Sequence, residues 1–134
     1  MQSTVQAAPV TREMLWTGIT MSTLPVLMFL LSAVMKFTKP ASLVEGFAHL
    51  GLPENLALGL GLLELACTVI YVIPQTSILG AILLTGYLGG ATLTHLRVGD
   101  AIFAPVIVGV FVWGGLFYRE PRLRVLIPLR RASA

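Results

Sequence analysis

Residues 56–73 read LALGLGLLELACTVIYVI, an apolar run with one carboxylate, Glu64, near its middle. A helix of about 20 apolar residues crosses the hydrocarbon core of a bilayer, so this run predicts a membrane-spanning helix. An ionised carboxylate at that depth is costly unless it is protonated or paired. The function of the chain therefore depends on what accompanies Glu64.

The composition indicates a single integral membrane domain. The 134 residues are 56% hydrophobic and 11% charged, whereas soluble domains carry about 25% charged residues. The net charge of +3 does not indicate nucleic-acid binding, because five of the nine basic residues follow the last apolar run, where topology or anionic lipid explains them. A single cysteine, Cys67, excludes an intrachain disulfide and predicts a small packing residue.

The predicted fold is all-α, a four-transmembrane-helix bundle formed by the whole chain, 1–134. A short amphipathic helix should lie in the membrane interface between the first two spans, and a basic cytoplasmic tail should follow the last. The predicted segments are spans at about 14–35, 56–73, 77–95 and 102–118, the interfacial helix at 41–50 and the tail at 119–134.

The distribution of Lys and Arg predicts the orientation. Four spans put both termini on one side of the membrane, and six basic residues fall on that side. The other side has three, namely Lys36, Lys39 and Arg97. Basic residues are enriched in cytoplasmic loops, so both termini should be cytoplasmic.

Glu64 should face the interior of the bundle. On a helical wheel it shares one face with Ala57, Gly61 and Thr68, and small and hydroxyl residues favour contact with a neighbouring helix. Gly86 and Gly90 predict a close helix crossing as well, and the sequence leaves open whether that crossing lies within one chain or between two.

Helix lengths predict which polar residues accompany Glu64. Ser32 is one turn deeper than Lys36, and Thr85 and Tyr87 should lie at about the level of Glu64. Lys36 itself is predicted mainly as an end-cap whose side chain reaches the surface. Glu64 is either a proton-handling or ligand-binding carboxylate, or a structural one bonded to a helix hydroxyl or to Lys36.

A polar turn follows the third span. His95, Arg97 and Asp100 predict either an anion or headgroup site or, as the favoured interpretation, a turn in which Arg97 and Asp100 neutralise each other. No metal site is predicted, because only Glu45 and His49 have a suitable spacing. The sequence also lacks the motifs of covalent haem, nucleotide and acyl-enzyme chemistry.

Several motifs in order resemble the DoxX-like family, which consists of small bacterial four-helix membrane proteins. The resemblance extends from about residue 14 to 129. It is carried by SAVMK at 32–36, EGFAHLGLP at 45–53, LEL at 63–65, THLRVGD at 94–100 and RLR at 122–124.

The resemblance implies a bacterial inner-membrane location and a redox context, since relatives are linked to quinol oxidation and to oxidative-stress complexes. The favoured function is therefore a redox- or quinone-associated membrane subunit with a redox or oxidative-stress partner. The alternatives are a non-catalytic scaffold or assembly protein, and an enzyme or carrier for small apolar molecules with Glu64 as acid and base. The sequence requires no cofactor, although a quinone fits the resemblance, and it leaves activity and oligomeric state open. The candidate catalytic residue is Glu64, and the candidate ligand-binding residues are Ser32, Lys36, Glu64, Thr85, Tyr87, His95, Arg97 and Asp100.

Overall fold

The computed structural model describes residues 7–127, and within them every regular element is an α-helix. The predicted all-α class is therefore confirmed. The helices are α1 (Arg12–Thr38), α2 (Ala41–His49), α3 (Leu56–Val72), α4 (Ser77–Arg97), α5 (Phe103–Arg119) and α6 (Pro121–Leu126).

Two of these helices, α1 and α4, are long and apolar enough to cross a membrane, and α3 and α5 are shorter apolar helices of 17 residues each. That all four cross the membrane remains a prediction. The sixth helix, α6, differs from the predicted tail. Pro121 fits its first turn, Glu120 accepts a hydrogen bond from the Arg122 N–H, and Leu123 is buried.

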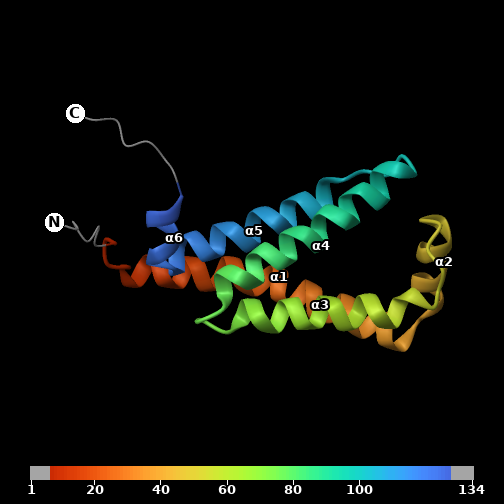
Figure 1. Cartoon of the computed structure of the whole chain (residues 1–134), viewed down its shortest axis with the longest axis horizontal. Coiled ribbons are helices and arrows are strands. Elements are labelled where there is room, and N and C mark those ends of the chain that lie inside the picture. Colours follow the sequence, from red (N-terminus) through yellow and green to blue (C-terminus); the bar gives the residue numbers. More distant parts are fainter. Residues whose placement is uncertain (1–6, 128–134) are drawn as a thin grey trace.

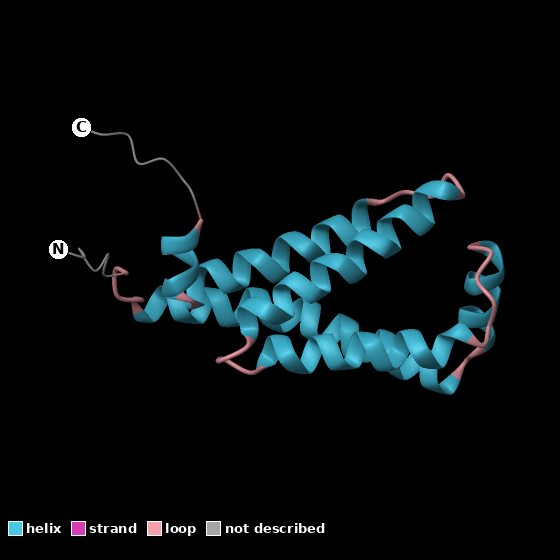
Figure 2. Ribbon diagram, viewed as in Figure 1, coloured by secondary structure: helices cyan, strands magenta, loops and turns pink. Residues whose placement is uncertain are grey.

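The four long helices form two pairs. α1 runs beside α3 and α4 beside α5, and the two pairs are joined by extensive packing of α1 against α5 and of α3 against α4. The pairs lie close together at the end that carries α6 and spread apart towards the end that carries α2 (Figure 1 and Figure 2).

Glycines produce the tight packing at the α6 end. A Cβ on Gly80 would lie 2.3 Å from the backbone N of Tyr71, and a Cβ on Gly115 would lie 2.3 Å from Ser22 Oγ. No side chain fits at these two positions, so α4 meets α3, and α5 meets α1, backbone against backbone. By contrast, nothing lies within 4 Å of a Cβ on Gly86 or Gly90. The predicted close crossing at these glycines is therefore wrong within the described chain.

The outer surface of the bundle is apolar. Many large hydrophobic side chains are exposed, among them Leu31, Leu62, Leu93 and Phe103. An apolar surface this extensive is unusual for a soluble monomer and typical of one that contacts lipid.

Candidate functional site

Glu64 lies inside the bundle, as the helical wheel predicted. All four residues of the predicted stripe, Ala57, Gly61, Glu64 and Thr68, are buried, and Glu64 is only 2% exposed. Gly61 lies one turn before Glu64, where a Cβ would come within 3.0 Å of Lys36 Cβ. The missing side chain therefore lets α1 approach α3 at the level of the carboxylate.

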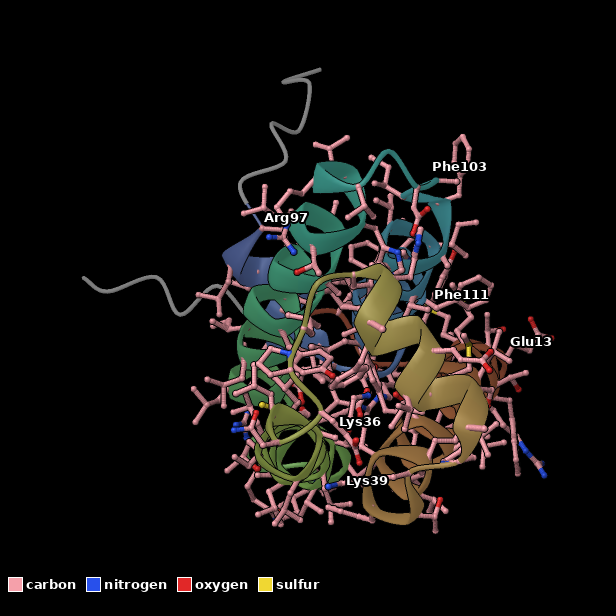
Figure 3. The ribbon with its side chains drawn as sticks, turned by 90° about the vertical axis from the view of Figure 1, so that its right-hand side faces the viewer. Glu13, Lys36, Lys39, Arg97, Phe103 and Phe111 are labelled. Atoms are coloured by element: carbon pink, nitrogen blue, oxygen red, sulfur yellow. The ribbon has the colours of Figure 1, made fainter. Side chains whose placement is uncertain are left out.

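Lys36 is the partner of Glu64. Its Nζ lies 2.8 Å from Glu64 Oε2 and also donates a hydrogen bond to Ser32 Oγ, one turn earlier on α1. The residue is 8% exposed. Seen from the α2 end, Lys36 lies in the interior of the bundle (Figure 3). The prediction that Lys36 reaches the surface is wrong, because pairing with a buried carboxylate compensates the charge there.

A cavity of about 650 Å³ adjoins this ion pair. It lies between the spread helix pairs, and its wall is mainly apolar. Leu63 and Leu83, which both line it, are 51% and 39% exposed, so the cavity reaches the outer surface between α3 and α4. Its lining residues include Met28, Phe29, Ser32, Lys36, Phe47, Leu50, Leu60, Leu63, Glu64, Cys67, Leu83, Gly86, Tyr87, Gly90, Thr94 and His95.

Five predicted ligand-binding residues line this cavity: Ser32, Lys36, Glu64, Tyr87 and His95. The ring centroid of Tyr87 is 6.0 Å from Lys36 Nζ, and its ring packs edge-on against Phe29. These residues come from α1, α3 and α4, so the fold brings three distant segments of the chain to one wall.

The other three predicted residues, Thr85, Arg97 and Asp100, are not part of the cavity wall. Thr85 Oγ1 accepts a hydrogen bond of 2.8 Å from Trp113 Nε1. It is two residues from Tyr87, and two residues turn a helix by about 200°, which puts the two side chains on opposite faces.

Asp100 joins α2 to the end of α4. Its carboxylate accepts hydrogen bonds from His49 Nε2 at 3.0 Å and from His95 Nδ1 at 3.3 Å. The two bonds lower the pKa of Asp100, and the bond from His49 has the larger effect. Arg97 donates instead to the carbonyl of Leu50, so the predicted Arg97–Asp100 pairing is wrong.

The Asp100 contacts hold α2 over one end of the cavity. Phe47 of α2, with Leu50 and Leu52 after it, contributes to the cavity wall. Phe47 was not among the residues predicted to bind a ligand. Its place on the apolar face of the short helix was the available signal. Within residues 7–127, no group of three or more His, Cys, Asp or Glu side chains is arranged to hold a metal ion.

A second buried polar cluster lies towards the α6 end. The Tyr71 hydroxyl donates to the carbonyl of Val112 at 2.8 Å and lies 3.0 Å from Ser22 Oγ, which also accepts from Arg119 Nε at 3.1 Å. Tyr71 is 0% exposed. The tyrosine therefore ties α3 to α1 and α5.

Comparison with known proteins identifies the family. The model of the DoxX-like family matches residues 4–115. The chain is a DoxX-like protein. No curated protein and no solved structure matches it. The family match therefore confirms the resemblance that the sequence motifs carry.

Proposed function

We propose that this DoxX-like protein is a redox-associated subunit of the bacterial inner membrane that binds a membrane-soluble quinone in the cavity beside Lys36 and Glu64. In this proposal α1, α3, α4 and α5 all cross the membrane, and both termini are cytoplasmic. One observation carries the proposal: a buried ion pair, 2.8 Å between its charged atoms, forms the polar part of an otherwise apolar cavity.

The membrane part of the proposal is supported by the helix dimensions. At about 1.5 Å per residue, the 17-residue helices α3 and α5 are about 26 Å long, a little less than the hydrocarbon core of about 30 Å. α1 and α4 are longer. The apolar outer surface and the excess of basic residues on the terminal side support the same arrangement.

The charge of the cavity wall favours a neutral ligand. Lys36 and Glu64 compensate each other, so a charged ligand would be left without a counter-ion in an apolar site. An ammonium group has three N–H donors, and among the described residues Lys36 uses two of them, towards Ser32 and Glu64. The third suits a carbonyl oxygen.

A quinone combines the required properties. It is neutral, its ring carries carbonyl acceptors, and its isoprenoid tail is soluble in the bilayer. A volume of about 650 Å³ lies within the range of about 300–1,000 Å³ typical of small-molecule sites. The opening between α3 and α4, beside the exposed Leu63 and Leu83, would leave the tail in lipid.

Protection of Cys67 from alkylation tests the proposal. Cys67 is the only cysteine of the chain and lines the cavity, so bound ligand should slow its reaction with N-ethylmaleimide. The purified protein in lipid nanodiscs would be alkylated with and without decylubiquinone, and its lipid extract would be analysed for quinones by mass spectrometry. We expect a quinone in the extract and at least fivefold slower alkylation with decylubiquinone.

Matched variants locate the contact. In Lys36→Met, at least tenfold more decylubiquinone should be needed to protect Cys67 to the same extent. In Lys39→Met, the concentration needed should be unchanged. Lys39 pairs with Glu54 at 3.8 Å on the surface and does not line the cavity. Equal protection in both variants, or none in the unmodified protein, would refute quinone binding at Lys36.

The same cavity supports a second candidate, an enzyme or carrier for small apolar molecules. Such a function needs an acid-base group in a sizeable cavity, and Glu64 with Ser32 and Tyr87 meets that requirement. A carrier would exchange labelled apolar ligand between vesicle populations in a Glu64-dependent manner. If Glu64→Gln abolishes such exchange while no quinone binds, this second function replaces the first.

A further inference from the structure

The glycines of the bundle fall into two groups. At Gly18, Gly80 and Gly115 a Cβ would lie within 2.3–2.7 Å of atoms of the neighbouring helix, so close packing explains the missing side chain. At Gly86 and Gly90 nothing lies within 4 Å of the Cβ position. A glycine inside a helix is unfavourable relative to alanine, and in the described chain no close approach accounts for these two.

The positions of Gly86 and Gly90 indicate what uses the space. They are four residues apart, so they lie one turn apart on the same side of α4. Both line the cavity, together with Tyr87 between them. Leu60 and Leu63 of the neighbouring α3 line the same cavity. Over one turn of α4, the cavity wall therefore includes bare backbone.

We propose that Gly86 and Gly90 are the specificity-determining residues of the cavity: their bare backbone is the surface on which the planar ring of the ligand lies. This inference rests on the proposed function. A flat ring needs an open surface along the helix, and side chains at these two positions would occupy that surface. The glycines then set how wide a ring the cavity accepts, while Lys36 binds its carbonyl.

Gly89 provides a matched control. It is on the same helix, and a Cβ there also meets nothing within 4 Å, but Gly89 does not line the cavity. Substitution at all three glycines should therefore be tolerated by the fold. Only the substitutions at Gly86 and Gly90 should affect the ligand.

The experiment compares Gly86→Leu, Gly90→Leu and Gly89→Leu in the full chain in nanodiscs. Binding would be measured through protection of Cys67 by decylubiquinone, with thermal unfolding recorded for each variant. We expect the first two substitutions to weaken protection at least tenfold and Gly89→Leu to change it less than twofold. All three should unfold at or above the temperature of the unmodified protein.

A smaller substitution tests specificity and covers the case in which leucine disturbs folding. Gly90→Ala should weaken binding of a two-ring probe, menaquinone with two isoprene units, at least fivefold more than binding of the one-ring decylubiquinone. A merely structural role would not change this ratio. If Gly90→Ala weakens binding of both probes equally, or if no glycine variant changes binding, the inference is refuted. Neither result would contradict quinone binding itself.

A contact between two copies of the chain at Gly86 and Gly90 would give a different result. If the glycines served contact between two copies of the chain, Gly86→Leu would reduce the mass of the particle and leave Cys67 protection intact. That result would overturn the inference. If the unmodified protein binds neither probe, the proposed function itself fails.

Discussion

Lys36→Met gives the most direct test of the buried ion pair. Methionine keeps much of the length of the lysine stem and removes the ammonium group, so Glu64 loses the partner that lies 2.8 Å away. The carboxylate remains 2% exposed. Removing one member of a buried pair costs about 3–5 kcal/mol, because the other charge is left uncompensated. The cavity beside the pair admits water-sized molecules, so we expect a loss near the lower end, about 3 kcal/mol.

The free energy of unfolding would be measured by titrating the protein from mild detergent into dodecyl sulfate and following helix content by circular dichroism. Lys39→Met is the control, because Lys39 and Glu54 form a surface pair at 3.8 Å with side chains 37% and 54% exposed. Its removal should cost about 0–1 kcal/mol. The double variant Lys36→Met/Glu64→Met should recover most of the loss, since it leaves no buried charge. A Lys36→Met loss no larger than that of Lys39→Met, or additive losses in the double variant, would refute the reasoning.

Three further predictions concern the packed α6 end of the bundle and the contacts of Asp100. Gly80→Ala should destabilise the protein by about 1–3 kcal/mol, since its Cβ would lie 2.3 Å from the backbone of Tyr71; in the same titration Gly59→Ala, which meets nothing within 4 Å, should be neutral or stabilising by up to about 1 kcal/mol. Tyr71→Phe should cost about 1–3 kcal/mol, because the carbonyl of Val112 loses its buried donor, and a stability equal to that of the unmodified protein would contradict the network. Hydrogen bonds from two histidines lower the pKa of Asp100 from its ordinary value of 3.8, so the contribution of Asp100 to holding α2 is complete above that pH and is lost as the pH falls through the lowered pKa. Hydrogen exchange of the α2 amides, corrected for intrinsic rates, should therefore accelerate only as the pH falls below 3.8, and Asp100→Asn should remove this pH dependence. Exchange that responds equally to pH in both proteins would count against the contact.

The helices follow from local sequence. Long apolar runs separated by Pro, Gly and charged residues specify α1, α3, α4 and α5, because backbone hydrogen bonds within a helix do not depend on distant partners. The inward direction of Glu64 was predictable for a similar reason. Its face of α3 carries small and hydroxyl residues at helical spacing, and this periodicity is a property of the helix alone.

Lys36 was one of the alternative partners predicted for Glu64, but the sequence did not decide between the alternatives. Lys36 and Glu64 are 28 residues apart, and their contact depends on how closely α1 approaches α3 at Gly61. The approach depends on three-dimensional packing, which the sequence pattern does not contain. For the same reason Asp100 was assigned to its sequence neighbour Arg97, although it contacts the more distant His49 as well as His95.

The glycines also show that a local sequence pattern does not predict which helices pack closely. In sequence, Gly86 and Gly90 have the spacing of a close helix crossing, and Gly80 has no such pattern. In the structure Gly80 meets the backbone of Tyr71, while Gly86 and Gly90 border the cavity. The local pattern of LALGLGLLELACTVIYVI was enough to specify a buried acid on an apolar helix. Only the approach of α1 to α3 at Gly61 decided that this acid is paired with Lys36, and only the spreading of the two helix pairs left an open cavity beside that pair.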